Sequence, residues 1–422
     1  MPTRQEWVNA LLNEYTVKVI SSNQLITDVK NKQLERIADL TAKEKLIPHM
    51  KTNLTPVTQF DPELDIKLTT YSLLHMVGLI TTPIVTNLVD ISSTWALYRY
   101  IWAFEIPTAA TVDPALKLSN IARNIDFHQK TLLSDEIGVG MAAYIMSTYF
   151  DAHHFTDIDV ALRSPTLGLI QTGSTSPDYL FYDNNKNYYV VECKGSQTSK
   201  NTSLDQLRRG TEQVPSIQFQ NGQSATSLIL ATCMLNDKTE VYIIDPPGDQ
   251  DDRYYKEELG GKTEQIGQNT WKVKDQKKFE TELDLMYRSK ILAFCGKEYE
   301  AVNLLPETLK GKIKIKTKQR AEEIFDVHET IFGNFEGITQ SLPILENVNI
   351  EVFRGLRSDL LNCYLENNEE KALVTKSELI KDIKGNSDFK SSNLIKLDYD
   401  NYTIIENVRT DGTIVRMKIS DK

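Results

Sequence analysis

The expected fold rests on two runs of sequence, Pro177-Asp178-Tyr179-Leu180-Phe181-Tyr182 and Tyr188-Tyr189-Val190-Val191-Glu192-Cys193-Lys194. Both runs are rich in aromatic and β-branched residues, and the segment 183–187 between them, DNNKN, favours a turn. The pattern predicts a β-hairpin. A turn symmetric about Asn185 places Tyr182 opposite Tyr188. Counting outward, Asp178 then faces Glu192, with the two side chains about 5 Å apart on one face of the sheet.

Two carboxylates at this spacing repel each other unless one is protonated or a cation lies between them. Oxygen ligands and incomplete coordination by protein suit Mg²⁺, with Mn²⁺ as a substitute. Such a metal would activate a water molecule and stabilise charge on a phosphate. Lys194 lies on the same face by the period of two and would assist the attacking water. We therefore expect Asp178 and Glu192 to bind metal and, with Lys194, to be catalytic. The alternative is an ordinary hairpin whose polar face meets solvent.

A helix is expected upstream of the hairpin, opening at 132–136 with Ser134 as its N-cap and running to about Phe150. Small residues follow Glu136 at helical spacing, at Gly140, Ala143 and Ser147. They would let the helix approach a sheet closely, so that Glu136 reaches the hairpin as a third metal ligand. The alternative role of Glu136 is to complement the helix dipole.

A second helix is expected at 203–214, because Ser203 and Gln206 have the spacing of a capping box and Pro215 follows. The alternative to capping is that Gln206, Arg209 and Gln213 form one helical face toward a nucleic-acid backbone. A groove lined by Lys194, Arg208 and Arg209 would add positive charge. The apolar runs 227–235 and 240–244 then predict two buried strands, which completes an α/β core.

This order and these motifs resemble the PD-(D/E)xK nuclease superfamily, which has the restriction-endonuclease-like fold, over about residues 130 to 245. The family's catalytic Asp, acidic residue and Lys map onto Asp178, Glu192 and Lys194, and its helical glutamate maps onto Glu136. Some members carry a Tyr four residues after a Gln in the later helix. Here Gly210 follows Gln206 at that spacing, which departs from the pattern.

The resemblance implies a Mg²⁺-dependent DNA endonuclease of microbial restriction, repair or antiphage defence. Two alternatives stay open: an RNA-cleaving nuclease, and a catalytically silent, nuclease-like binding or assembly module. The three-residue motif is short, and it gains weight from the order of strands and helices around it.

The chain has 422 residues, which suggests about two or three domains. We expect a helical N-terminal domain at 1–128, a nuclease-like domain at 129–300 and an α+β C-terminal domain at 301–422. The fold class is then α/β, with a mixed central sheet flanked by helices. The uncharged segment 68–89 is expected to form buried helices instead of a membrane span. Residues 402–409 and 413–419 are expected to form a closing hairpin.

The net charge of −10 means that any nucleic-acid binding must be local. Four lysines, Lys312, Lys314, Lys316 and Lys318, would share one face of a strand. They could bind phosphates or protect a sheet edge from pairing. The protein could also form a homo-oligomer or bind a partner subunit, which could supply affinity for nucleic acid. The four cysteines lack paired spacing, and the N-terminus lacks the apolar core of a signal peptide, so we expect a cytoplasmic protein.

Overall fold

The structure is a computed structural model, and it describes residues 3–45, 47–48, 50–83, 96, 99–105, 113–162, 169–170, 176–247, 270–310, 325–342, 347–385 and 394–422. Its centre is a seven-stranded sheet in the order β2 (Glu63–Thr69), β1 (Glu14–Ile20), β9 (Thr239–Ile244), β8 (Thr226–Met234), β6 (Tyr188–Ser196), β5 (Tyr179–Tyr182), β3 (His154–Asp157). The pairs β1–β9 and β6–β8 are parallel and the others antiparallel. The sheet is therefore mixed, as the sequence predicts.

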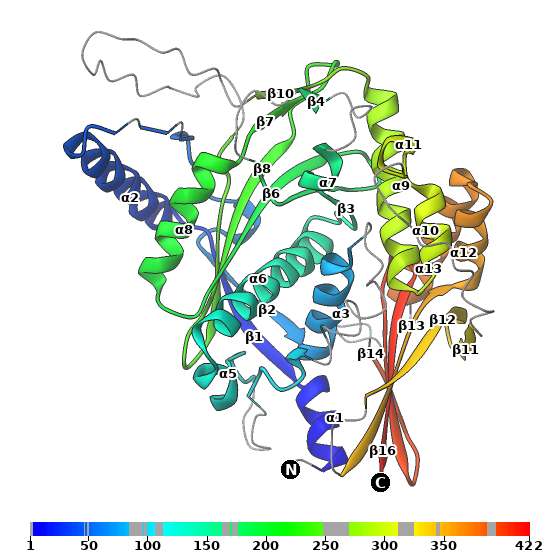
Figure 1. The fold of residues 1–422 in the computed structure, drawn as a ribbon. Helices are drawn as coiled ribbons and strands as arrows, with labels where there is room; N and C mark the ends of the chain where they lie inside the picture. The colour runs from blue at the N-terminus through cyan, green and yellow to red at the C-terminus, as the bar shows by residue number, and fades with distance from the viewer. Residues whose placement is uncertain are drawn as a thin grey trace.

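Helices cover both faces of this sheet (Figure 1). On one face, α6 (Phe127–Tyr149) packs on β6 and β8 and is backed by α3 (Thr70–Thr81). On the other face, α8 (Lys200–Gln213) packs on the same strands and is backed by α2 (Asn23–Ala42). Alternate residues of β6 enter the two cores, because Val191 and Cys193 face α6 while Val190 faces α8.

The C-terminal part forms a six-stranded antiparallel sheet in the order β11 (Asp326–Thr330), β12 (Gly333–Leu342), β13 (Val348–Arg357), β16 (Thr413–Asp421), β15 (Tyr402–Val408), β14 (Leu394–Asp398). The predicted closing hairpin is confirmed as β15 and β16. Helix α12 (Ser358–Leu365) packs on β12 and β13 of this sheet, and α13 (Glu369–Gly385) packs on α12. It packs against α1 (Arg4–Leu12), α3 and α9 (Gln276–Phe294).

The remaining elements are short. A three-stranded sheet joins β4 (Leu169–Ile170), β10 (Thr270–Val273) and β7 (Ser216–Gln218). The other short elements are the helices α5 (Asn120–Asn124), α7 (Ile158–Leu162), α10 (Glu298–Leu304) and α11 (Glu307–Lys310), and the 3-10 turn η1 (Thr58–Phe60).

The predicted helical N-terminal domain at 1–128 is wrong. The helices α1 and α2 are present, but β1 lies between them and enters the central sheet beside β9. Alternate residues of β1 are buried, which is the pattern of a strand with one face on a core. The N-terminal region therefore completes the central sheet and does not form a domain of its own.

The uncharged segment 68–89 contains α3, whose residues from Thr70 to Ile80 are all buried, and its remainder from residue 84 lies outside the described residues. The predicted buried helix is confirmed over α3. Across the described ranges no helix is long and apolar enough to cross a membrane. All four cysteines are buried and free.

Candidate active site

The register of the hairpin is the one that the sequence predicts. Tyr182 pairs with Tyr188 and Tyr179 with Val191, so Asp178, one residue before β5, lies next to Glu192 of β6. A hydrogen bond fixes this end of the hairpin, because the backbone N–H of Cys193 donates to Oδ2 of Asp178 at 2.8 Å. The two predicted carboxylates therefore converge at one place.

Lys194 joins them from the same face of β6. Glu192 and Lys194 alternate with Cys193 and project to the α8 side of the sheet. The Glu192 carboxylate is fully buried, and its Oε1 forms an ion pair with Nζ of Lys194. Neither oxygen of Glu192 has a well-aligned hydrogen bond. The Lys194 side chain is 22% exposed, so the buried Glu192 carboxyl lies beside a side chain that reaches solvent.

The three groups influence one another's protonation. Burial, followed by the charge of Asp178, raises the pKa of Glu192 to about 8, although Lys194 opposes the rise. Burial also raises the pKa of Asp178, against the effects of Lys194 and of the Cys193 N–H. Burial works against the charge of Lys194, but Glu192 and Asp178 outweigh it and raise the pKa of the ammonium. At neutral pH the two carboxyl groups of Asp178 and Glu192 therefore hold one more proton than two free carboxylates would.

Two further carboxylates influence this centre, and neither was among the site residues predicted from the sequence. Asp157 ends β3 opposite Tyr179, and Asp135 lies on α6; each raises the pKa of Asp178 through its charge. Lys194 in turn opposes the rise that burial causes in the pKa of Asp135. Asp157 has a local role as well, since its Oδ1 accepts a hydrogen bond from Val160 N at the start of α7, at 3.0 Å. Asp135 directly precedes Glu136 in the sequence, so the signal that pointed to Glu136, a carboxylate on that helix, could also have pointed to Asp135.

Helix α6 begins two turns earlier than predicted. Its N-cap is Asp126, whose carboxylate accepts from the backbone N–H groups of His128 and Gln129, while Ser134 lies inside the helix. The close approach to β6 occurs at Gly138 and Gly195. A Cβ on Gly195 would lie 1.8 Å from Ser134 O, and one on Gly138 would lie 2.8 Å from Lys194 O.

Glu136 lies on a different side of α6 from this contact. The predicted stripe through Gly140 faces α3, because a Cβ on Gly140 would meet Val77. The Glu136 carboxylate accepts a hydrogen bond from the Tyr100 hydroxyl, and Arg99 lies 4.0 Å away. The structure therefore engages Glu136 with other partners and does not bring it to Asp178 and Glu192.

Helix α8 begins before the predicted capping box. Its N-cap is Ser199, which accepts from Thr202 N, whereas Ser203 is buried within the helix. Gln206 points toward the strand that carries Lys194, since its Nε2 donates to Gly195 O at 2.8 Å. Its Oε1 is buried without a hydrogen bond. Gln206 is half-buried, holds the end of β6 and does not cap the helix.

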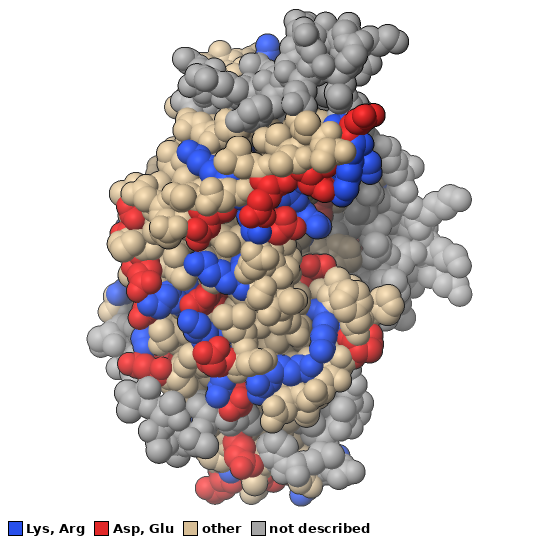
Figure 2. All heavy atoms as spheres, turned by 90° about the vertical axis from the view of Figure 1, so that its left-hand side faces the viewer, with Lys and Arg blue, Asp and Glu red and all other residues tan. Residues whose placement is uncertain are grey.

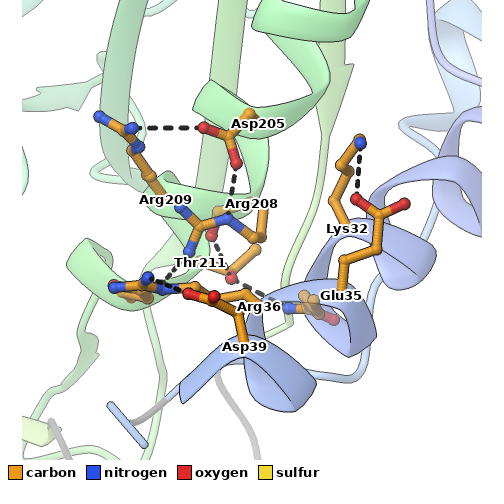
Figure 3. A network of polar contacts seen from close by, with 10 residues as sticks. Lys32, Glu35, Arg36, Asp39, Asp205, Arg208, Arg209 and Thr211 are labelled. Carbon is orange, nitrogen blue, oxygen red and sulfur yellow. Dashed lines mark hydrogen bonds and ion pairs between the residues drawn. The ribbon is translucent and has the colours of Figure 1, made fainter. Parts of the chain in front are cut away.

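The two arginines of α8 that were expected to line a nucleic-acid groove instead form ion pairs with carboxylates of the same helix (Figure 3). Arg208 is buried, and its guanidinium contacts Asp205 at 3.0 Å and also pairs with Glu212. Arg209 is exposed but lies 3.3 Å from the other oxygen of Asp205. Gln213 is the last residue of the helix and is half-buried. Of Arg208, Arg209 and Gln213, only Arg209 presents a cation to solvent.

The α2–α8 side carries mixed charge. Figure 2 shows that Lys and Arg lie there among Asp and Glu and do not form one basic surface. Arg36 on α2 and Lys43, the residue that caps its C-terminus, both pair with Asp39. Lys312, Lys314, Lys316 and Lys318 lie outside the described residues.

The donor chemistry at Asp178 and Glu192 fits a hard divalent cation. Both are carboxylates, and Glu192 keeps two buried oxygens that lack well-aligned hydrogen bonds. In the described part of the chain, no three acidic, histidine or cysteine side chains are arranged to hold a metal ion. Water and a substrate phosphate would therefore have to fill the remaining coordination positions, as Mg²⁺ usually allows.

Comparisons of the chain with protein-family models, curated proteins and solved structures find no match. The resemblance to the nuclease superfamily stays a prediction that rests on the residues and their arrangement.

Proposed function

We propose that this protein is a metal-dependent nuclease that hydrolyses phosphodiester bonds, with DNA as the favoured substrate. The observation that carries the proposal is the convergence of Asp178 and Glu192 on adjacent strands beside Lys194. Asp178 and Glu192 would hold Mg²⁺ or Mn²⁺, which supplies an activated water and neutralises charge on the phosphate. Lys194 would place a positive charge beside the attacking water. A role in microbial restriction or antiphage defence follows from the family resemblance alone.

Several contacts prepare the residues for these roles. The Cys193 N–H orients Asp178, and Gln206 and α6 hold the strand at Gly195. Burial makes Glu192 a poor anion until a cation or the ammonium of Lys194 compensates its charge. The proton on the pair would leave when a cation binds, because carboxylate ligands must be deprotonated.

Incubation of the purified protein with plasmid, linear duplex, single-stranded DNA and RNA tests the proposal, with Mg²⁺, Mn²⁺ or EDTA in parallel. Cleavage should require the metal. Asp178→Asn and Lys194→Met should each lower the rate at least about a hundredfold. Glu35→Gln, which changes an exposed carboxylate paired with Lys32 on α2, is the matched control and should cleave normally. Equal cleavage by Asp178→Asn, or cleavage in EDTA, would contradict the proposal.

The second candidate is a silent, nuclease-like binding or assembly module. It is favoured by the Lys194–Glu192 ion pair and by the lack of a three-ligand cluster among the described residues. Calorimetric titration with Mg²⁺ separates the two candidates. The nuclease should bind Mg²⁺ and lose binding in Asp178→Asn, whereas the silent module should show no Mg²⁺ binding and no cleavage. Cleavage of RNA alone would keep the chemistry and change the substrate.

A further inference from the structure

The C-terminal sheet ends in an edge strand, β14. In the described residues β14 pairs with β15 and with no other strand. Its residues Lys396, Leu397 and Asp398 are exposed, and Leu397 is 38% accessible to solvent. An edge strand presents N–H and C=O groups that can pair with a further strand. Edge strands are common, so the side chains of β14 decide whether a partner strand fits.

The side chains of β14 divide into an apolar face and a charged face. Ile395 packs against an apolar cluster of the C-terminal sheet, and Leu397 shares the face of Ile395 by the period of two. Tyr399 follows β14 directly and is 47% exposed. On the opposite face, Nζ of Lys396 lies 2.8 Å from Oδ2 of Asp398, and both side chains reach solvent. Apolar and charged side chains therefore alternate along this edge.

A two-fold axis at Leu397 makes this strand complementary to itself. In an antiparallel pair of two copies, Leu397 then faces Leu397 of the second copy, Lys396 faces Asp398, and Ile395 faces Tyr399. Apolar side chains meet apolar ones, and each charge meets its opposite. Moving the axis by one residue places Lys396 opposite Lys396, or Asp398 opposite Asp398, and like charges in these positions repel. The side chains therefore specify one register.

The other edge of the same sheet lacks this property. A lysine on an edge strand ordinarily prevents pairing with another chain. On β14 the aspartate two residues later turns that lysine into a possible partner. The opposite edge strand, β11, carries Asp326 and Glu329 but no lysine or arginine. No register of two β11 strands can therefore place a carboxylate opposite a lysine or an arginine.

We propose that β14 pairs with β14 of a second copy of this chain, antiparallel about Leu397. The two six-stranded sheets would then form one continuous sheet across a symmetric dimer. One short strand from each copy buries little surface, so the association is weak and depends on protein concentration. The inference is independent of the proposed nuclease function, because it makes no use of Asp178, Glu192 or Lys194.

Sedimentation velocity over about a hundredfold range of protein concentration tests the dimer. The wild-type protein should shift from monomer to dimer as its concentration rises. Lys396→Glu and Asp398→Lys should each weaken the dimer about tenfold or more, because each places like charges opposite one another. The double variant exchanges the two charges and should restore the dimer. An equal mixture of the two single variants should also dimerise, because each strand then faces opposite charges.

A cysteine in place of Leu397 tests the register. Leu397→Cys should form an intermolecular disulfide on mild oxidation, because the two facing residues lie within disulfide reach. All four native cysteines are buried and do not compete. The control is Val327→Cys on β11, which replaces a side chain that is 60% exposed. It should cross-link far less. Equal cross-linking of the two cysteine variants would overturn the proposed pairing.

The charge variants need a control for net charge and for folding. Lys43→Glu makes the same change of charge at a side chain that is 57% exposed at the end of α2, and it should dimerise as the wild type does. Circular dichroism should show that every variant is folded, since the altered side chains are exposed. A wild-type protein that stays monomeric, single variants that dimerise normally, or a double variant that stays monomeric would each overturn the inference.

Discussion

Glu192 is the residue on which the properties of the candidate site depend most. Its carboxyl group is fully buried beside Asp178, and burial raises its pKa to about 8. A group that holds a proton in the folded state and loses it in the unfolded state makes stability depend on pH. Between its unfolded value of about 4.3 and about 8, the folded protein binds more protons, so its free energy of unfolding should fall as pH rises.

The same pKa predicts how metal binding depends on pH. Mg²⁺ needs the deprotonated carboxylate, so its affinity should rise as pH approaches about 8 and then level off. Below that value the affinity should fall about tenfold per pH unit, because one proton competes with one cation. Calorimetry at several pH values, in buffers of different ionisation enthalpy, measures both the affinity and the proton released. Glu192→Gln should abolish the proton release. If the affinity for Mg²⁺ did not change between pH 6 and 8, Glu192 would not hold a proton in the metal-free protein.

At the scale of elements, the contact between α6 and β6 positions the site. Gly195→Ala should destabilise the protein by about 1 to 3 kcal/mol, because the new Cβ would lie 1.8 Å from the Ser134 carbonyl and both atoms belong to backbone. The helix must then move away from the strand that carries Lys194. Urea denaturation measures the loss, and Mg²⁺ affinity should fall with it.

Gly385→Ala provides the control for this substitution. Gly385 ends α13, and an added Cβ meets nothing within 4 Å. The free energy of unfolding of the Gly385→Ala protein should change little or rise slightly, because alanine favours a helix more than glycine does. If Gly195→Ala proved as stable as Gly385→Ala, the close packing of α6 on β6 would be wrong.

The elements that the sequence predicted correctly depend on local patterns. The β5–β6 register follows from a period of two and a short turn, and β8 and β9 follow from continuous apolar runs. The predictions that failed depend on contacts between distant parts of the sequence, or on the rotation of a helix about its own axis. The placement of β1 requires its pairing with β9, more than two hundred residues away. Asp135 and Glu136 differ by about 100° around one helix, so only packing decides which carboxylate comes close enough for the charge of Lys194 to influence its pKa.

At the scale of the molecule, the two large sheets share one apolar core through α3 and α9. Polar contacts cross the same boundary. The Tyr71 hydroxyl of α3 donates to the carbonyl oxygens of Ile405 and Val415, at 3.3 and 3.1 Å. Arg409, in the turn between β15 and β16, donates to Ser147 Oγ of α6 at 3.1 Å and to Asp411 Oδ2 at 3.0 Å. The C-terminal sheet is therefore tied to the helix that supports the site.

Asp411 tests this connection. Burial opposes its charge, but Arg409 and hydrogen bonds from Thr413 outweigh burial and hold the pKa of Asp411 at about 2. Its contribution to stability should be present above its unfolded pKa of about 3.9 and be lost as pH falls toward 2. At pH 7, Asp411→Asn should cost about 3 to 5 kcal/mol, because it leaves the Arg409 charge without its buried partner. Asp398→Asn, which removes an exposed pair with Lys396 on the same sheet, should cost less than about 1 kcal/mol.

Urea unfolding followed by tryptophan fluorescence and by far-ultraviolet circular dichroism measures both variants. Trp7 and Trp271 are buried in the two different apolar cores, so the fluorescence change reports on both faces of the central sheet. The two signals should coincide in one transition that shifts to lower urea in Asp411→Asn, because the sheets and helices share contacts. Two separate transitions, only one of them shifted in Asp411→Asn, would mean that the C-terminal sheet unfolds by itself. Arg409 and Asp411 would then stabilise that sheet alone and have no influence on α6 or on Lys194.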